Sequence, residues 1–173
     1  MSRMIAASLA TLAIASLATA ARAETNVTVS ETHLCCGQCL KGVEAALKDV
    51  KGVTQKSDQG AKTIAIVAEN DEAAQKAIDA LAAAGFYGKT DNQAVKYKTA
   101  TAASGTVEKA EVSGLHNCCG QCTTAIKKAV TSVSGVTGTS VKNKETTFTV
   151  EGKFSPSDLQ AALLKAGFNC QVK

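Results

Sequence analysis

The chain has 173 residues, of which 45% are hydrophobic, 20% charged and only 3% aromatic, and it contains seven cysteines, one proline and no tryptophan. The length allows one domain or two small ones. The apolar content is too high for a disordered chain, and seven cysteines are too few for a small scaffold held together by disulfides. The formal net charge of +4 suggests a basic protein, but part of that charge lies at the start of the chain.

Residues 1–23 have the pattern of a signal peptide for export. Arg3 provides a short positive start, an apolar run extends from Met4 to Ala20, and Ala21-Arg22-Ala23 offers a small-x-small cleavage pattern. The run is shorter than the ~20 residues of a membrane span and is rich in Ala, Ser and Thr, which favours cleavage over anchoring. We therefore expect a periplasmic or secreted protein, and no other segment of the sequence predicts a membrane span.

The composition of the mature chain argues against nucleic-acid binding. Arg3 and Arg22 are the only arginines, so cleavage after residue 23 lowers Lys+Arg from 19 to 17, against 15 acidic residues, and the net charge becomes 17 − 15 = +2. Guanidinium groups that read phosphate and guanine are then absent, and aromatic side chains for base stacking are scarce. We expect no nucleic-acid partner.

A cysteine-rich segment occurs twice in the chain. His33–Cys39 (HLCCGQC) recurs as His116–Cys122 (HNCCGQC), with six of seven positions identical at an offset of 83 residues. The tripeptide at 84–86 (AGF) recurs at 166–168, at an offset of 82. Self-similarity of this kind predicts two units with the same fold.

The predicted units are residues 24–98 and 107–173, joined by a flexible linker at 99–106 that is rich in Thr, Ala, Ser and Gly. Each unit is predicted to run strand, helix, strand, strand, helix, strand. Alternating apolar residues such as Val27 and Val29 predict the opening strand. The helix after the cysteines is predicted from apolar residues at helical spacing, which are Val43, Ala46, Leu47 and Val50 in the first unit and Ile126, Ala129, Val130 and Val133 in the second.

Glycine, serine and proline predict the ends of the helices. Gly52 and Gly135 are expected to end the first helix of each unit in the left-handed conformation, as Gly85 and Gly167 end the second. Ser155 followed by Pro156 predicts the start of the last helix. The expected fold is therefore α+β, with two tandem βαββαβ units, each a four-stranded antiparallel sheet with two helices on one face.

Cys36 and Cys39 form a C-x-x-C motif at the predicted start of a helix, as do Cys119 and Cys122. Residues at i and i+3 lie on one side of the first turn, so both sulfurs can converge on one point. The free N–H groups and the positive end of the helix dipole favour the thiolate there. Thiolates are the ligands that soft metal ions prefer.

At this point the chain resembles the heavy-metal-associated domain family, whose small ferredoxin-like modules carry a metal-binding C-x-x-C between the first strand and the first helix. Copper chaperones and periplasmic mercury-binding proteins are members. The resemblance implies two tandem copies, with one metal site at Cys36 and Cys39 and another at Cys119 and Cys122. It also implies that the phenylalanine of each AGF segment, Phe86 or Phe168, shields the site of its own unit.

The sequence departs from the family pattern just before the motif. Family members usually have Met two residues before the first motif cysteine, where this chain has Leu34 and Asn117, each followed by a further cysteine. Each copy therefore gathers three cysteines and one histidine, and the candidate extra ligands are Cys35, Cys118, His33 and His116. Zn²⁺ accepts such mixed sites, and Cu(I) or Hg(II) accepts a thiol-rich one, so the identity of the metal stays open.

Two other interpretations of the cysteines stay open. A C-x-x-C in an exported chain can be a thiol–disulfide redox pair, although the Trp and cis-Pro of thioredoxin-like folds have no counterpart here. The cysteines could also be structural, in a module that only binds partners. Cys170 has no counterpart in the first copy and is expected to be a buried thiol or a disulfide partner.

The sequence thus predicts an exported protein that sequesters a soft metal ion or delivers it to a membrane metal transporter. The alternative is a thiol–disulfide carrier that uses the two CGQC segments. No pattern of catalytic acids, bases or nucleophiles is present, so an enzyme is not expected. Export places the thiols in an oxidising compartment, where C-x-x-C pairs tend to close into disulfides.

Overall fold

The computed structural model describes residues 23–173. The predicted signal peptide therefore lies outside the described residues, apart from Ala23. Twelve helices and strands follow one another in the order predicted for two βαββαβ units. They are β1 (Thr25–Ser30), α1 (Gly37–Leu47), β2 (Val53–Asp58), β3 (Thr63–Ala68), α2 (Asp71–Ala83), β4 (Lys89–Thr90), β5 (Val107–Ser113), α3 (Gly120–Thr131), β6 (Val136–Thr139), β7 (Thr147–Phe154), α4 (Pro156–Lys165) and β8 (Gln171–Val172).

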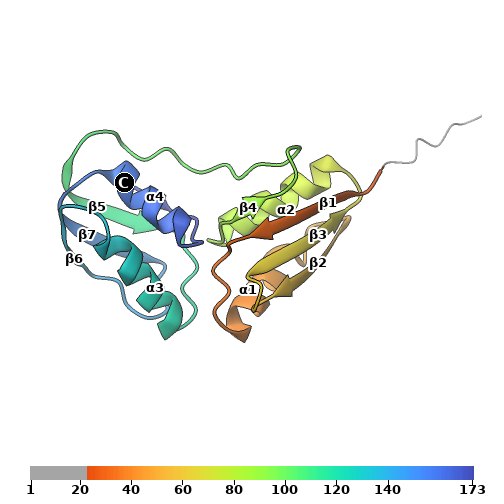
Figure 1. The fold of residues 1–173 in the computed structure, drawn as a ribbon, viewed down its shortest axis with the longest axis horizontal. Coiled ribbons are helices and arrows are strands. Elements are labelled where there is room, and N and C mark those ends of the chain that lie inside the picture. The colour runs from red at the N-terminus through yellow and green to blue at the C-terminus, as the bar shows by residue number, and fades with distance from the viewer. Residues whose placement is uncertain (1–22) are drawn as a thin grey trace, which may run out of the picture.

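The strands form two separate four-stranded antiparallel sheets. The order is β2-β3-β1-β4 in the first half of the chain and β6-β7-β5-β8 in the second. In each sheet the strand that opens the half lies between the third strand and the short last strand. The structure is therefore α+β, with two helices for each sheet (Figure 1).

Alternating burial in the strands and a buried stripe on each helix form the cores. Thr25, Val27 and Val29 of β1 are buried, as the alternation predicts. The stripe predicted for the second unit is buried throughout, whereas the first unit buries only Val43 and Leu47 of its predicted stripe. The start of α4 is also as predicted, since the Ser155 hydroxyl accepts a hydrogen bond from the backbone N–H of Asp158 with Pro156 in the first turn.

Two predicted helix ends are wrong in position. Gly52 and Gly135 have φ of 70° and 86°, as expected for left-handed glycines. However, α1 already ends at Leu47 and α3 at Thr131, so both glycines lie in the turns that lead into β2 and β6. Gly85 and Gly167, by contrast, directly follow the last turns of α2 and α4 and have the left-handed φ predicted for them.

The two halves lie side by side, and the loops that precede α1 and α3 run along the seam between them (Figure 1). The two AGF segments, at 84–86 and 166–168, contact each other across this seam. Phe86 and Phe168 form an antiparallel bridge. The N–H of Tyr87 donates to the carbonyl of Gly167 at 3.2 Å, and the N–H of Asn169 donates to the carbonyl of Gly85 at 3.0 Å. The same segment of each half therefore pairs with its own counterpart.

The segment that joins the halves has no regular secondary structure between Asp91 and Gly105. It crosses from one half to the other above the seam in Figure 1. Side chains of both halves hold it: Gln75 makes two hydrogen bonds of 2.9 Å to the backbone of Lys96, and Gln160 donates to the carbonyl of Ala100 at 2.7 Å. The predicted linker at 99–106 is thus irregular, but it is attached to α4.

None of the helices in the described part of the chain is long and apolar enough to cross a membrane.

The close approach at the seam depends on glycine at position 85, and replacement by alanine is expected to destabilise the protein. Gly85 has a φ of 83°, where a residue with Cβ costs roughly 1–2 kcal/mol. A Cβ there would also collide with the backbone of Leu115 and His116 in the other half. The control is Gly114→Ala, because Gly114 has a similar φ of 81° but open space around its Cβ position.

Urea denaturation of both variants separates the two contributions. Gly114→Ala should lose about 1–2 kcal/mol of unfolding free energy from the backbone alone, and Gly85→Ala clearly more. Equal losses for the two variants would mean that the halves do not approach each other as described.

Candidate metal centre

The motif cysteines lie at the N-terminal ends of α1 and α3. Cys36 and Cys119 have extended backbone with φ of −160° and −155° and occupy the N-cap positions of the two helices. Cys39 and Cys122 lie in the first turns and are fully buried, whereas Cys36 and Cys119 are half-buried at the rim. Backbone N–H groups near both helix starts and the positive ends of the helix dipoles favour negative charge on these sulfurs.

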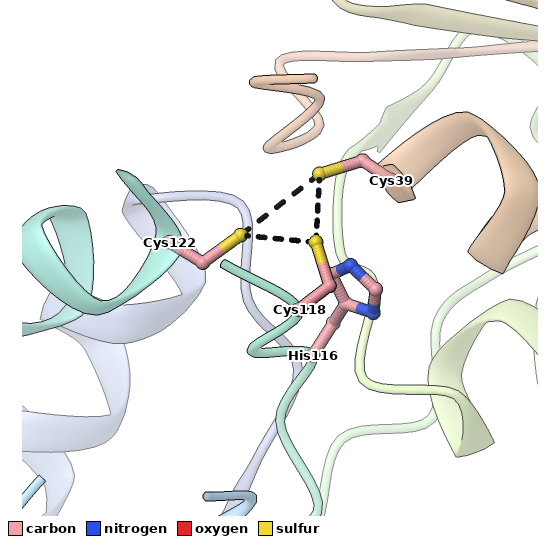
Figure 2. Close-up of side chains that lie close together, drawn as sticks. All are labelled: Cys39, His116, Cys118 and Cys122. Atoms are coloured by element: carbon pink, nitrogen blue, oxygen red, sulfur yellow. Dashed lines mark hydrogen bonds between the residues drawn. The ribbon is translucent and has the colours of Figure 1, made fainter. Parts of the chain in front are cut away.

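The two helix starts face each other, so the cysteines of both halves form one group. The sulfur of Cys39 lies 3.6 Å from that of Cys118 and 3.9 Å from that of Cys122, both in the other half (Figure 2). The sulfur of Cys35 lies 3.5 Å from that of Cys122. Towards the rim, the sulfur of Cys119 lies 3.6 Å from that of Cys35 and 3.7 Å from that of Cys36. Six sulfurs therefore meet across the seam.

Each motif histidine lies against the phenylalanine of the opposite half. His116 is stacked on Phe86 with ring centroids 4.2 Å apart, and His33 lies 4.5 Å from Phe168. The Nε2 atoms of both histidines are buried and have no hydrogen-bond partner. A buried polar atom without a partner is costly, and a metal ion at the neighbouring sulfurs would supply one. Phe86 and Phe168 thus contact the histidine of the other copy, whereas the resemblance implied that each shields the site of its own unit.

Three overlapping sets of side chains have donor atoms close enough to hold a metal ion. In each set the donor atoms all lie within 4.8 Å of one another. The first ligand group is Cys39, His116, Cys118 and Cys122; the second is His33, Cys35 and Cys122; and the third is Cys35, Cys36 and Cys119. Figure 2 shows the first group, with the His116 ring beside the Cys118 sulfur. Every group contains residues of both halves.

The contact between the Cys39 and Cys122 sulfurs shifts the pKa values of the two thiols in opposite directions. A hydrogen bond from the Cys122 thiol lowers the pKa of Cys39 against the effect of burial, and the same contact raises the pKa of Cys122. The contact therefore favours the thiolate on Cys39 and the thiol on Cys122. Burial raises the pKa of Cys35 and of Cys118 and lowers the pKa of His33, which favours the neutral imidazole that a metal ion requires.

Cys119 is expected to be the rim thiol that alkylating reagents modify near neutral pH. Burial opposes its ionisation, but the backbone N–H groups of Cys122 and Gln121 and the Cys35 thiol outweigh this and lower the pKa of Cys119 to about 7. Because the thiolate is the nucleophile, modification should accelerate as the pH rises through about 7 and level off above it. Cys170 is the internal control, because it is buried and burial raises its pKa to about 12.

Peptide mapping after timed iodoacetamide treatment of the reduced, metal-free protein between pH 5.5 and 9 measures both residues. Modification of Cys119 that still accelerates between pH 8 and 9 would contradict the assignment of a lowered pKa. Labelling of Cys170 at a similar rate would show that the fold had opened.

The two positions that depart from the family pattern are structural. Leu34 is buried in the apolar core at 1% exposure. Asn117 is buried and donates hydrogen bonds of 2.8 Å to the carbonyls of Lys142 and Glu145, while its own carbonyl accepts one of 2.9 Å from Thr123. Cys170 is a buried free thiol directly before β8, in line with one of the two expectations for it. Each of the eight residues predicted at the site belongs to at least one of the three ligand groups.

Comparison with known proteins supports metal binding for one half. Residues 111–169 match the model of the heavy-metal-associated domain. This match covers the second copy of the repeat and under half of the chain. No curated protein matches the chain.

Solved structures with a similar course of the chain include two from Bacillus subtilis. The N-terminal soluble domains of CopA are 18% identical, with 88% of this chain and 95% of that chain covered at a TM-score of 0.29. The water-soluble region of the P-type ATPase CopA is 19% identical, with 88% and 93% covered at 0.32. The first two RRM domains of the yeast poly(U) binding protein Pub1 are 14% identical, with 86% and 98% covered at 0.26. At these TM-scores the similarities carry no weight for function.

Proposed function

We propose that this protein binds soft metal ions outside the cytoplasm through the cysteines at the seam, and that it stores them or delivers them to a membrane metal transporter. In this proposal residues 24–98 and 107–173 are two modules of the heavy-metal-associated kind. Residues 1–23 direct export and are removed. The proposal assigns no catalytic step to the protein.

The observation that carries the proposal is the gathering of six sulfurs and two partnerless imidazole nitrogens in one place. Four sulfurs around an ion with metal–sulfur bonds of about 2.3 Å lie about 3.8 Å from one another. The sulfur separations across the seam are 3.5 to 3.9 Å. Binding would therefore require little rearrangement, and Cu(I), Hg(II) and Zn(II) are the ions that such ligands suit.

The proposed ligands of the bound ion are Cys36, Cys39, Cys119 and Cys122, with Cys35, Cys118, His33 and His116 as further ligands. The rim position of Cys36 and Cys119 leaves two sulfurs accessible to an incoming thiol. Transfer would then proceed by ligand exchange, with a thiol of the acceptor displacing one rim cysteine at a time.

Titration of the reduced protein with Cu(I), Zn(II) and Hg(II), followed by native mass spectrometry, tests the proposal. At least one of these ions should bind. Joint replacement of Cys36, Cys39, Cys119 and Cys122 by serine should abolish binding, whereas Cys170→Ser should bind as the unaltered protein does. Absence of binding to all three ions, or unchanged binding by the fourfold variant, would overturn the proposal.

A thiol–disulfide carrier is the second candidate, and the same sulfur contacts favour it. A disulfide has a sulfur–sulfur bond of about 2.04 Å, so only small side-chain movements separate that bond from thiols whose sulfurs are 3.5 to 3.9 Å apart. In such exchange the disulfide of a substrate is reduced to two thiols and accepts the two electrons and two protons of the pair. Such a carrier should exchange disulfides with a model substrate such as insulin in the absence of metal. Thiol content and metal content of freshly isolated protein distinguish the two candidates, because a metal-binding protein should contain metal and free thiols together.

A further inference from the structure

The cysteines of the two halves are arranged around a pseudo-twofold axis. The contact between Cys35 and Cys122, at 3.5 Å, has its counterpart in the contact between Cys118 and Cys39, at 3.6 Å. The ring contact between His116 and Phe86, with centroids 4.2 Å apart, has its counterpart in the ring contact between His33 and Phe168, with centroids 4.5 Å apart. The seam is thus a self-complementary interface of the kind that forms twofold dimers, built within one chain.

This symmetry places the cysteine that precedes each motif opposite the motif of the other half. Cys118 lies 3.6 Å from Cys39, and Cys35 lies 3.5 Å from Cys122. Each of the two also contacts the second motif cysteine of its own half, at 3.6 Å for Cys35 and 3.7 Å for Cys118. Cys35 and Cys118 therefore connect the two motifs, which a chain with one independent site per motif would not require.

The ligand groups also share members. Cys122 belongs to the first and the second group, and Cys35 belongs to the second and the third. A thiolate has more than one lone pair and can bridge two soft metal ions. Ions in neighbouring groups would therefore be joined through common sulfurs and would not occupy separate sites.

We propose that the two halves hold one polynuclear thiolate cluster of a soft monovalent cation such as Cu(I), with Cys35 and Cys118 as the ligands that cross the seam. This inference rests on the proposed function and adds the stoichiometry and the shared ligands. The first ion fixes the side chains of sulfurs that already lie close together, so later ions meet donors that are already ordered. Filling is therefore cooperative.

Native mass spectrometry during stepwise addition of Cu(I) to the reduced protein tests the cluster. At sub-saturating copper the expected spectrum contains mainly the metal-free protein and one fully loaded species with more than two copper ions. Solvent-shielded polynuclear Cu(I)–thiolate clusters luminesce, so emission should rise in proportion to the loaded species. Stepwise appearance of one and then two ions without emission would overturn the cluster and leave the proposed function intact. No copper binding at all would also overturn the cluster, and the proposed function would be overturned with it only if Zn(II) and Hg(II) failed to bind as well.

The variant that decides the role of the crossing ligands carries Cys35→Ser and Cys118→Ser together. It retains both C-x-x-C motifs, so it should still bind up to two copper ions, but without cooperativity and without emission. Cys170→Ser is the matched control and should load and emit as the unaltered protein does. Circular dichroism verifies that the double variant is folded. A folded double variant that still loads cooperatively beyond two ions would overturn the assignment of Cys35 and Cys118.

Discussion

Replacement of Cys39 by alanine is expected to weaken metal binding by the whole protein, and not only by its own half. Cys39 is fully buried and contacts three other sulfurs, those of Cys35, Cys118 and Cys122. The hydrogen bond from the Cys122 thiol also lowers the pKa of Cys39, which favours the thiolate that binds metal. Loss of a residue that only hydrogen-bonds to a metal ligand already costs roughly 10–100-fold in metal affinity. Loss of the Cys39 sulfur, a proposed ligand itself, should therefore lower the metal affinity by more than about a hundredfold.

Cys36→Ala is the matched comparison for Cys39→Ala. Cys36 belongs to the same motif, but it lies half-buried at the rim, with its sulfur 3.7 Å from that of Cys119. Competition with a chelator of known affinity measures the metal affinity of both variants. Cys36→Ala should lose clearly less metal affinity than Cys39→Ala. If Cys39→Ala lost one metal site and kept another at full affinity, the two halves would bind independently and the account of a common centre would be wrong.

Replacement of Phe86 by alanine is expected to affect stability and metal binding together. Phe86 is 1% exposed, forms the bridge to Phe168 and carries the His116 ring. Truncation of a buried phenylalanine costs about 3–5 kcal/mol. The lost ring supports both the seam and a candidate ligand. Both the unfolding free energy and the metal affinity of Phe86→Ala should therefore decrease.

Phe154→Ala separates these two effects. Phe154 is also 1% exposed, but it lies at the end of β7, where it pairs with Val107 of β5, and it belongs to none of the ligand groups. It should lose a similar unfolding free energy in urea while the folded protein keeps its metal affinity. Equal metal affinities for Phe86→Ala and Phe154→Ala would mean that the seam does not support the centre.

The internal order of each half could be predicted from local patterns. Alternation at Val27 and Val29 and the signals at Ser155 and Pro156 act between residues a few positions apart, and the structure has a strand and a helix there. Gly52 and Gly135 were misplaced because a left-handed glycine serves equally well at a helix end and in a turn before a strand.

The shared centre could not be predicted in the same way. A repeat shows that two segments fold alike, but not that they face each other, because docking depends on the shape of surfaces formed by distant residues. Two signals were present nonetheless. The histidine recurs at the offset of the cysteines, and the AGF segment recurs at nearly the same offset, although neither His33 nor Gly85 belongs to the C-x-x-C motif.

X-ray absorption at the copper edge of the Cu(I)-loaded protein tests the central claim most directly, because it reports the neighbours of the bound ions themselves. The account requires a shell of sulfur ligands together with a short copper–copper distance, since thiolates of both halves are shared between ions. The copper–copper contribution should disappear when Cys35 and Cys118 are replaced by serine. Copper with two sulfur neighbours and no second copper nearby would mean that each C-x-x-C motif acts alone, and the shared centre would be contradicted.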